Sequence, residues 1–233
     1  MIQGEFGGPS TNILLQNYYR GGSYVPNSTT NSNVPTSGQI ALENFYGAAN
    51  FTPILHTYTN NTTSGNISGT ETVPSGATTV VIEVWGGGGS SGQGYKDVTT
   101  GVLQDGGGGG GAGYARSSYS VTPGQTINYT VGMGNNTSTV TSGSLSVTTM
   151  TANAGQQGGA ATANNNGSGG LGGSASGGNQ TNTTGNPGSG ASGGTAPNGV
   201  NTNNPASWGN GASGTFGGPV AGSGGEVSFY YTN

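Results

Sequence analysis

The chain has 233 residues, of which 52 are glycine, three are Lys or Arg and seven are Asp or Glu. Three isolated bases, Arg20, Lys96 and Arg116, cannot supply the clustered cations that nucleic acid or an anionic membrane surface requires, so we expect neither as a partner. Cysteine is absent, which excludes disulfides and thiolate metal sites. The sequence also contains no run of about 18 apolar residues, so we expect no membrane insertion.

The N-terminal part contains a tandem repeat. Shifting the chain by 27 residues aligns Ile13–Tyr19 with Ile40–Tyr46, and each copy has a polar opening, a short apolar run and a glycine just after its aromatic pair. This pattern predicts two helices of about two turns, which are too short to be stable alone. We expect them to pack on each other and on a partner, or else to form a small core that serves only this chain. The docking candidates are Ile13, Leu15, Tyr18, Tyr19, Ile40, Leu42, Phe45 and Tyr46.

The chain divides into three predicted parts: a duplicated docking module over 1–56, a linker over 57–72 and a glycine-rich domain over 73–233. The linker is assigned because Thr, Asn, Ser and Gly dominate it. Runs rich in β-branched and aromatic residues predict strands at 80–85, 115–121, 126–131, 145–151 and 226–231. The predicted fold is mainly β: short N-terminal helices, then an antiparallel sheet combined with glycine-rich helices of the polyglycine II type.

Small residues recur at every third position in parts of the tract from 155 to 225. One series begins Gly155, Gly158 and Ala161, and others begin at Gly211 and Gly218. A three-residue period fits extended helices that have no internal hydrogen bonds, and the small residues let neighbouring backbones approach and bond to each other. An unstructured linker is the alternative interpretation of such a composition.

Catalytic chemistry has little support in the sequence. His56 is the only histidine and has no cysteine to join it at a metal site, and Asp97 with Asp105 is better explained as a solvated loop than as a glycosidase pair. We therefore expect no enzyme activity, metal or cofactor. Aromatic residues in polar, glycine-rich surroundings favour binding, because rigid rings contribute contact area at little entropic cost. The receptor-binding candidates are Tyr95, Lys96, Asp97, Tyr114 and Trp208, and for Tyr114 and Trp208 the alternative is that they cover a small core.

Two groups of segments resemble bacteriophage proteins. Residues 4–8, 18–22 and 34–48 resemble an N-terminal module of tailed-bacteriophage tail and virion proteins. Residues 72–89, which end in Trp85-Gly86-Gly87-Gly88-Gly89, and residues 121–125 resemble the glycine-rich domain of phage tail-fibre proteins. In plan the chain is similar to the tip adhesins of T-even-like phages, although its N-terminal module differs from their usual attachment segment.

This resemblance implies a virion protein of the tail, assembled in the host cytoplasm without a signal peptide. Its implied partners are other tail proteins, through the N-terminal module, and a host surface protein or glycan, through loops on the glycine-rich scaffold. It would act as a homotrimer or as a monomeric cap on a trimeric fibre. The alternative is a purely structural tail or baseplate component that contacts other virion subunits.

Overall fold

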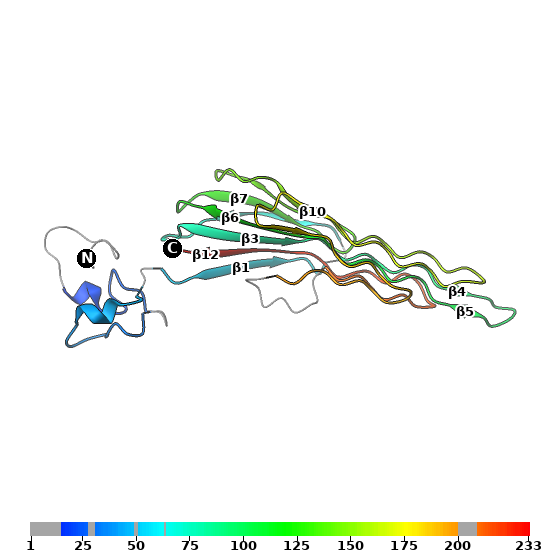
Figure 1. Cartoon of the computed structure of the whole chain (residues 1–233), viewed down its shortest axis with the longest axis horizontal. Coiled ribbons are helices and arrows are strands. Elements are labelled where there is room, and N and C mark those ends of the chain that lie inside the picture. The colour runs from blue at the N-terminus through cyan, green and yellow to red at the C-terminus, as the bar shows by residue number, and fades with distance from the viewer. Residues whose placement is uncertain (1–14, 28–30, 49–50, 63, 200–208) are drawn as a thin grey trace.

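The computed structural model describes residues 15–27, 31–48, 51–62, 64–199 and 209–233. Figure 1 shows a small N-terminal part, a pair of stacked β-sheets and a long extension that points away from the N-terminal part. The C-terminus lies at the end of the sheets that faces the N-terminal part. No helix in the described ranges is long and apolar enough to cross a membrane.

The first sheet has five antiparallel strands in the order β1-β12-β3-β6-β11. Its members are β1 (Ile54–Thr59), β12 (Glu226–Thr232), β3 (Thr79–Trp85), β6 (Tyr114–Ser120) and β11 (Thr181–Thr183). The C-terminal strand therefore lies between β1 and β3, and it closes the sheet after the chain has passed through the glycine-rich segments.

The second sheet is also antiparallel, with the order β10-β9-β8-β7-β2. It contains β2 (Ile67–Thr72), β7 (Thr126–Val131), β8 (Ser138–Ser142), β9 (Met150–Ala152) and β10 (Ala175–Ser176). A separate two-stranded hairpin consists of β4 (Tyr95–Lys96) and β5 (Leu103–Gln104). The mainly β, antiparallel fold expected from the sequence is confirmed.

The hydrophobic core lies between the two sheets. Alternate residues of the first sheet, such as Ile82 and Phe229, are fully buried against Ile127 and Met150 of the second. This arrangement follows from the strand period of two, which places apolar residues of one strand on a single face. The core is small for a chain of this length, so interactions other than hydrophobic packing must stabilise the long extension.

The N-terminal part contains two one-turn 3-10 helices, η1 (Leu15–Tyr18) and η2 (Leu42–Phe45), which begin 27 residues apart and so occupy the same position in each repeat. They are shorter than the two turns predicted from the sequence. The equivalent residues Tyr18 and Phe45 contact each other edge to face, with ring centroids 6.5 Å apart. Val25 and Val34 complete this small core.

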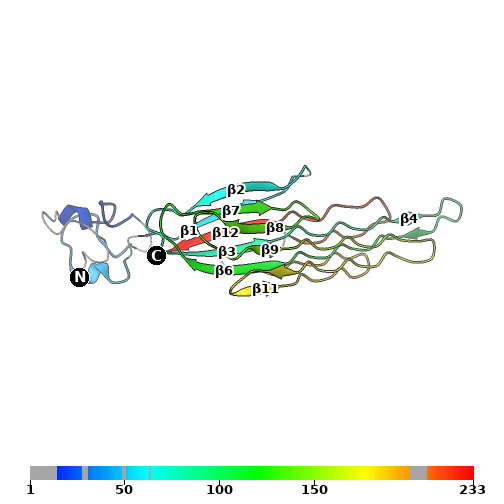
Figure 2. The same ribbon diagram turned by 90° about the horizontal axis from the view of Figure 1, so that it is seen from above.

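The extension, which we call the glycine-rich arm, consists of residues 86–113, 153–174, 184–199 and 209–225 (Figure 2). Its central run, 106–113, donates its backbone N–H groups to three neighbouring segments in turn. Every third donor bonds to the same segment: 209–215, 153–159 or 186–190. In chain order, these donors reach the carbonyl oxygens of Thr215, Gly159, Gly190, Ala212, Gln156, Asn186, Gly209 and Asn153 at 2.7 to 3.1 Å.

Carbonyl groups of the central run accept hydrogen bonds from three further neighbours. The carbonyl oxygens of Gly108, Gly109 and Gly110 accept from the N–H groups of Gly170, Gly194 and Gly89, each at 2.8 Å. The central run is thus surrounded by backbone on all sides. A polyglycine II conformation for these runs stays a prediction, and the hydrogen bonds follow the three-residue period that such a helix requires.

Glycine is required in this run because the surrounding backbone leaves no room for a Cβ atom. A Cβ on Gly110 would lie 1.9 Å from the carbonyl oxygen of Leu171. The predicted series shows the same crowding at Gly155 and Gly158, where a Cβ would lie 1.9 Å and 2.0 Å from carbonyl oxygens of the central run. At Gly218, by contrast, nothing lies within 4 Å, so that position does not need glycine for close packing.

The predicted linker over 57–72 is wrong for most of its length, because it contains the last part of β1 and all of β2. Both are edge strands, and their exposed side chains are mostly polar, with Leu55 and Ile67 as the apolar exceptions. The strand predicted at 145–151 is also shorter than expected: it begins only at Met150, although Leu145 and Val147 still reach the core.

Candidate functional site

The far end of the glycine-rich arm carries the hairpin β4–β5 (Figures 1 and 2). Tyr95 pairs with Gln104 and Lys96 with Leu103, and the connecting residues 97–102 form the outermost turn. Three of the predicted receptor-binding residues, Tyr95, Lys96 and Asp97, therefore lie together at this end. We call residues 95–104, together with Phe216, the tip.

Asp97 shapes the turn of the tip. Its Oδ1 accepts hydrogen bonds from the backbone N–H groups of Thr99 at 2.7 Å and Thr100 at 3.1 Å. The Thr100 side chain and these two backbone groups hold the pKa of Asp97 below its usual value. Asp97 is half-buried, and its carboxylate holds the turn together at the end of the hairpin.

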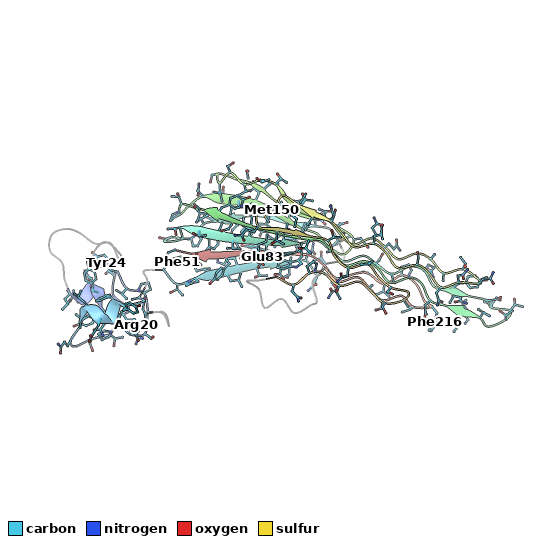
Figure 3. The ribbon with its side chains drawn as sticks, viewed as in Figure 1. Arg20, Tyr24, Phe51, Glu83, Met150 and Phe216 are labelled. Carbon is cyan, nitrogen blue, oxygen red and sulfur yellow. The ribbon has the colours of Figure 1, made fainter. Side chains whose placement is uncertain are left out.

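Apolar side chains are unusually exposed at the tip. Val98 has 88% of its surface exposed, Leu103 49% and Phe216 58%. Phe216 reaches this place because the N–H of Gly94 donates to the carbonyl of Gly217 at 3.0 Å, which fixes the segment 214–217 beside the base of the hairpin (Figure 3). Exposed apolar groups close to one lysine and one carboxylate are typical of a surface that binds a partner.

Tyr114, predicted as a receptor-binding residue, does not have that role. It is 3% exposed at the start of β6, its ring packs on Trp85 with centroids 4.8 Å apart, and its hydroxyl donates to Glu83. The correct interpretation was the alternative, a residue that covers a small core. Trp208, the remaining receptor-binding candidate, lies outside the described residues.

The docking candidates of the N-terminal part divide into two groups. Tyr18 is buried in the small core, and Ile40 and Phe45 pack against that core, so these three side chains help to hold the two repeats together. Leu15, Leu42 and Tyr46 are 56%, 76% and 88% exposed, so these side chains are the ones available to another subunit. Tyr19 is half-buried and its hydroxyl donates to the carbonyl of Gly38. Ile13 lies outside the described residues.

The sequence interpretation missed the apolar part of the tip. Val98, Leu103 and Phe216 were not singled out, although Phe216 stands between Thr215 and Gly217 in the kind of polar, glycine-rich setting that drew attention to Tyr95. The missing information was spatial, because residues 103 and 216 are far apart in sequence. Within the described residues no group of three or more His, Asp or Glu side chains is placed to hold a metal ion.

Comparison with known proteins gives one family. A family model described as a glycine-rich domain matches residues 60–232, which include eleven of the twelve strands and the whole arm. No curated protein matches the chain. Since the matched range covers far more than half of the sequence, this chain belongs to the glycine-rich domain family.

Proposed function

We propose that the chain is a bacteriophage tail or tail-fibre protein that binds a host surface through the tip of its glycine-rich arm. The observation that carries the proposal is the position of the tip. Exposed apolar residues, a lysine and a carboxylate stand at the end of a nearly uncharged extension whose segments are joined by backbone hydrogen bonds, far from the N-terminal part. The sequence resemblance to phage tail proteins supplies the biological setting.

The arm suits a display function for a physical reason. Its segments are held by backbone hydrogen bonds, as the central run shows, so outward side chains contribute little to the scaffold. Leu171, in the middle of the arm, is 62% exposed and flanked by crowded glycines on both sides. Side chains at the tip can therefore be specialised for binding without a cost to folding.

The opposite end supports attachment to the particle. Leu15, Leu42 and Tyr46 expose apolar surface on the duplicated module, and none of them is needed by its small core. Under the proposal this face contacts other tail proteins and the tip contacts a host protein or glycan. A purely structural role is the second candidate, and the exposed apolar face of the module favours it equally.

A binding experiment with two matched variants separates these functions. Fluorescently labelled full-length protein is incubated with a panel of Gram-negative strains and bound fluorescence per cell is measured. The tip variant combines V98D with F216S, and the control variant combines L42D with Y46S, both at exposed positions. We expect at least a tenfold loss of binding for the tip variant only. Saturable binding that needs the N-terminal residues instead, or no binding to any strain, would favour the structural role.

A further inference from the structure

Two buried glutamates lie on the outer face of the first sheet, opposite the hydrophobic core. Glu83 in β3 is 1% exposed and Glu226, the first residue of β12, is 2% exposed. In the strand register Ser228 pairs with Glu83 and Glu226 pairs with Trp85, so the two glutamates are diagonal neighbours on one face. Side chains in this relation are close enough to interact. Figure 3 labels Glu83 within the body of the sheets, and β3 passes into the arm three residues later, at Gly86.

The partners of the two carboxyl groups differ. Glu83 accepts a hydrogen bond from the Tyr114 hydroxyl, and its Oε1 lies 3.8 Å from Nε of Arg116. Glu226 has an oxygen, Oε1, that is buried and has no hydrogen-bond partner, and the neighbouring Ser228 hydroxyl is also unpartnered. Arg116 is paired with Glu83 by charge alone, because its Nε is also buried without a hydrogen-bond partner, and Glu226 has no ion pair among the described residues.

In the part of the chain that the structure describes, the residues that face Glu226 from the neighbouring strands supply no further positive charge. On this face β1 contributes Thr57 and Thr59, and β11 contributes Thr181 and Thr183. Tyr230, farther along β12, is the only other titratable residue of that strand on this face. The segment that covers Trp85, residues 195–199, has none, and the sequence from 200 to 208 contains none either.

Burial, and to a smaller extent the charge of Glu83, raise the pKa of Glu226 from 4.5 to about 7. The physical cause is that a second negative charge would enter a site that solvent does not reach and where one guanidinium already serves one carboxylate. The folded protein therefore holds a proton that the unfolded chain releases at lower pH.

The pair also occupies the joint between the sheets and the arm. Three central strands pass into glycine runs here: Trp85 precedes Gly86, Tyr114 follows Gly113 and Glu226 follows Gly225. The N–H of Gly86 donates to the carbonyl of Gly113, and the N–H of Gly225 donates to the carbonyl of Gly132 at 2.8 Å. A change of charge at Glu226 is therefore adjacent to the hydrogen bonds that attach the arm.

We propose that Glu226 and Glu83 form a proton-dependent joint, in which a proton held by Glu226 keeps the base of the glycine-rich arm fixed to the sheet and its loss loosens the arm. The sign follows from the folded state binding the proton more tightly than the unfolded state. The contribution of this proton to folding stability is complete below 4.5, the pKa of Glu226 in the unfolded chain, and is lost as the pH rises through the folded-state pKa of about 7. Over that window the unfolding equilibrium constant rises by up to about tenfold per pH unit.

The test uses the full chain, the variant E226Q and the control E43Q, which removes an exposed carboxylate from the N-terminal part. Urea unfolding is measured between pH 4.5 and 8. We expect the wild type and E43Q to lose stability as pH rises, and E226Q, a neutral mimic of the protonated residue, to lose this dependence. An unchanged pH dependence in E226Q overturns the proposal.

A second measurement uses the wild-type chain and therefore does not depend on whether a variant folds. The chain has five glutamates, at 5, 43, 71, 83 and 226, so a spectrum of ¹³C-labelled Glu side chains is simple to titrate. We expect one carboxyl carbon to titrate near pH 7, with amide protection of Gly86, Gly113 and Gly225 falling over the same range. Five carboxyl carbons that all titrate below pH 5.5, or protection at these glycines that is independent of pH, would refute the joint.

Discussion

The hydroxyl of Tyr58 in β1 donates a 2.6 Å hydrogen bond to Oε2 of Glu71 in β2, and so joins an edge strand of one sheet to an edge strand of the other. The second oxygen of Glu71 accepts from the hydroxyl of Tyr231 at 3.0 Å and lies 2.7 Å from Nδ1 of His56. One buried carboxylate thus gathers three side chains of the first sheet. Burial, together with this hydrogen bond, raises the pKa of the Tyr58 hydroxyl.

Replacing Glu71 by alanine should destabilise the sheets by about 3 kcal/mol, because the half-buried hydroxyl of Tyr58 and the buried hydroxyl of Tyr231 would lose their acceptor. Urea unfolding of the full chain at pH 7 measures the effect. The control E43A removes an exposed glutamate and should change stability by less than about 0.5 kcal/mol. Equal effects of the two variants would show that the carboxylate does not hold the sheets together.

The change G110A should disrupt the arm. A Cβ there would lie 1.9 Å from a backbone carbonyl oxygen, and the surrounding segments cannot move apart without breaking several hydrogen bonds. We expect a loss of at least about 3 kcal/mol, or failure to fold. The matched control is G218A, which has free space around the new methyl group and should be neutral or slightly stabilising. Thermal unfolding of both variants tests the difference.

Protonation of Asp97 should loosen the tip at acid pH. Because hydrogen bonds hold its pKa below the ordinary value of 3.8, the turn stays ordered above that pH and loses its order as pH falls through the lowered value. The amide chemical shift of Thr99 should report the transition in an NMR titration. In D97N, which keeps an acceptor oxygen but does not titrate, the same amide should show no such step.

Replacing Asn60 by aspartate should be costly although the two residues have the same shape. Asn60 is fully buried, and its Nδ2 donates to the carbonyl oxygens of Gly65 and Val131, both at 2.9 Å. An aspartate oxygen would face those two carbonyls without a hydrogen atom between them, which should cost about 3 kcal/mol at pH 7 and less at pH 5. The adjacent exposed change N61D provides the control in the same unfolding assay.

The sequence predicts the strands and the glycine packing best, because these depend on local periods. β3, β7 and β12 alternate or cluster apolar residues, and their predicted bounds agree with the structure to within a residue or so. The repeat of 27 residues likewise predicts the positions of the two short helices, although they are one-turn 3-10 helices and not helices of two turns. β1 and β2 were missed because an edge strand with Thr-rich outward positions has the composition of a loop.

The candidate site was predictable only in part. Tyr95, Lys96 and Asp97 stood out because they interrupt glycine-rich sequence, but nothing local distinguishes them from Tyr114, which is buried on Trp85. Exposure at the tip depends on how far each segment of the glycine-rich arm extends beyond the sheets. That distance is set by long-range hydrogen bonds such as the one from Gly94 to Gly217, and the periodicity of the sequence does not predict such bonds.

The direction of the hydrogen bonds around residues 106–113 has a mechanical consequence. The segments of the arm run along its length (Figure 1), while these bonds connect one segment to the next across it. A pull on the tip along the arm would load these bonds in shear, so that many must rupture together instead of opening one by one. Resistance to such a pull would then come from the backbone hydrogen bonds of the arm, without disulfides and with only a small hydrophobic interior.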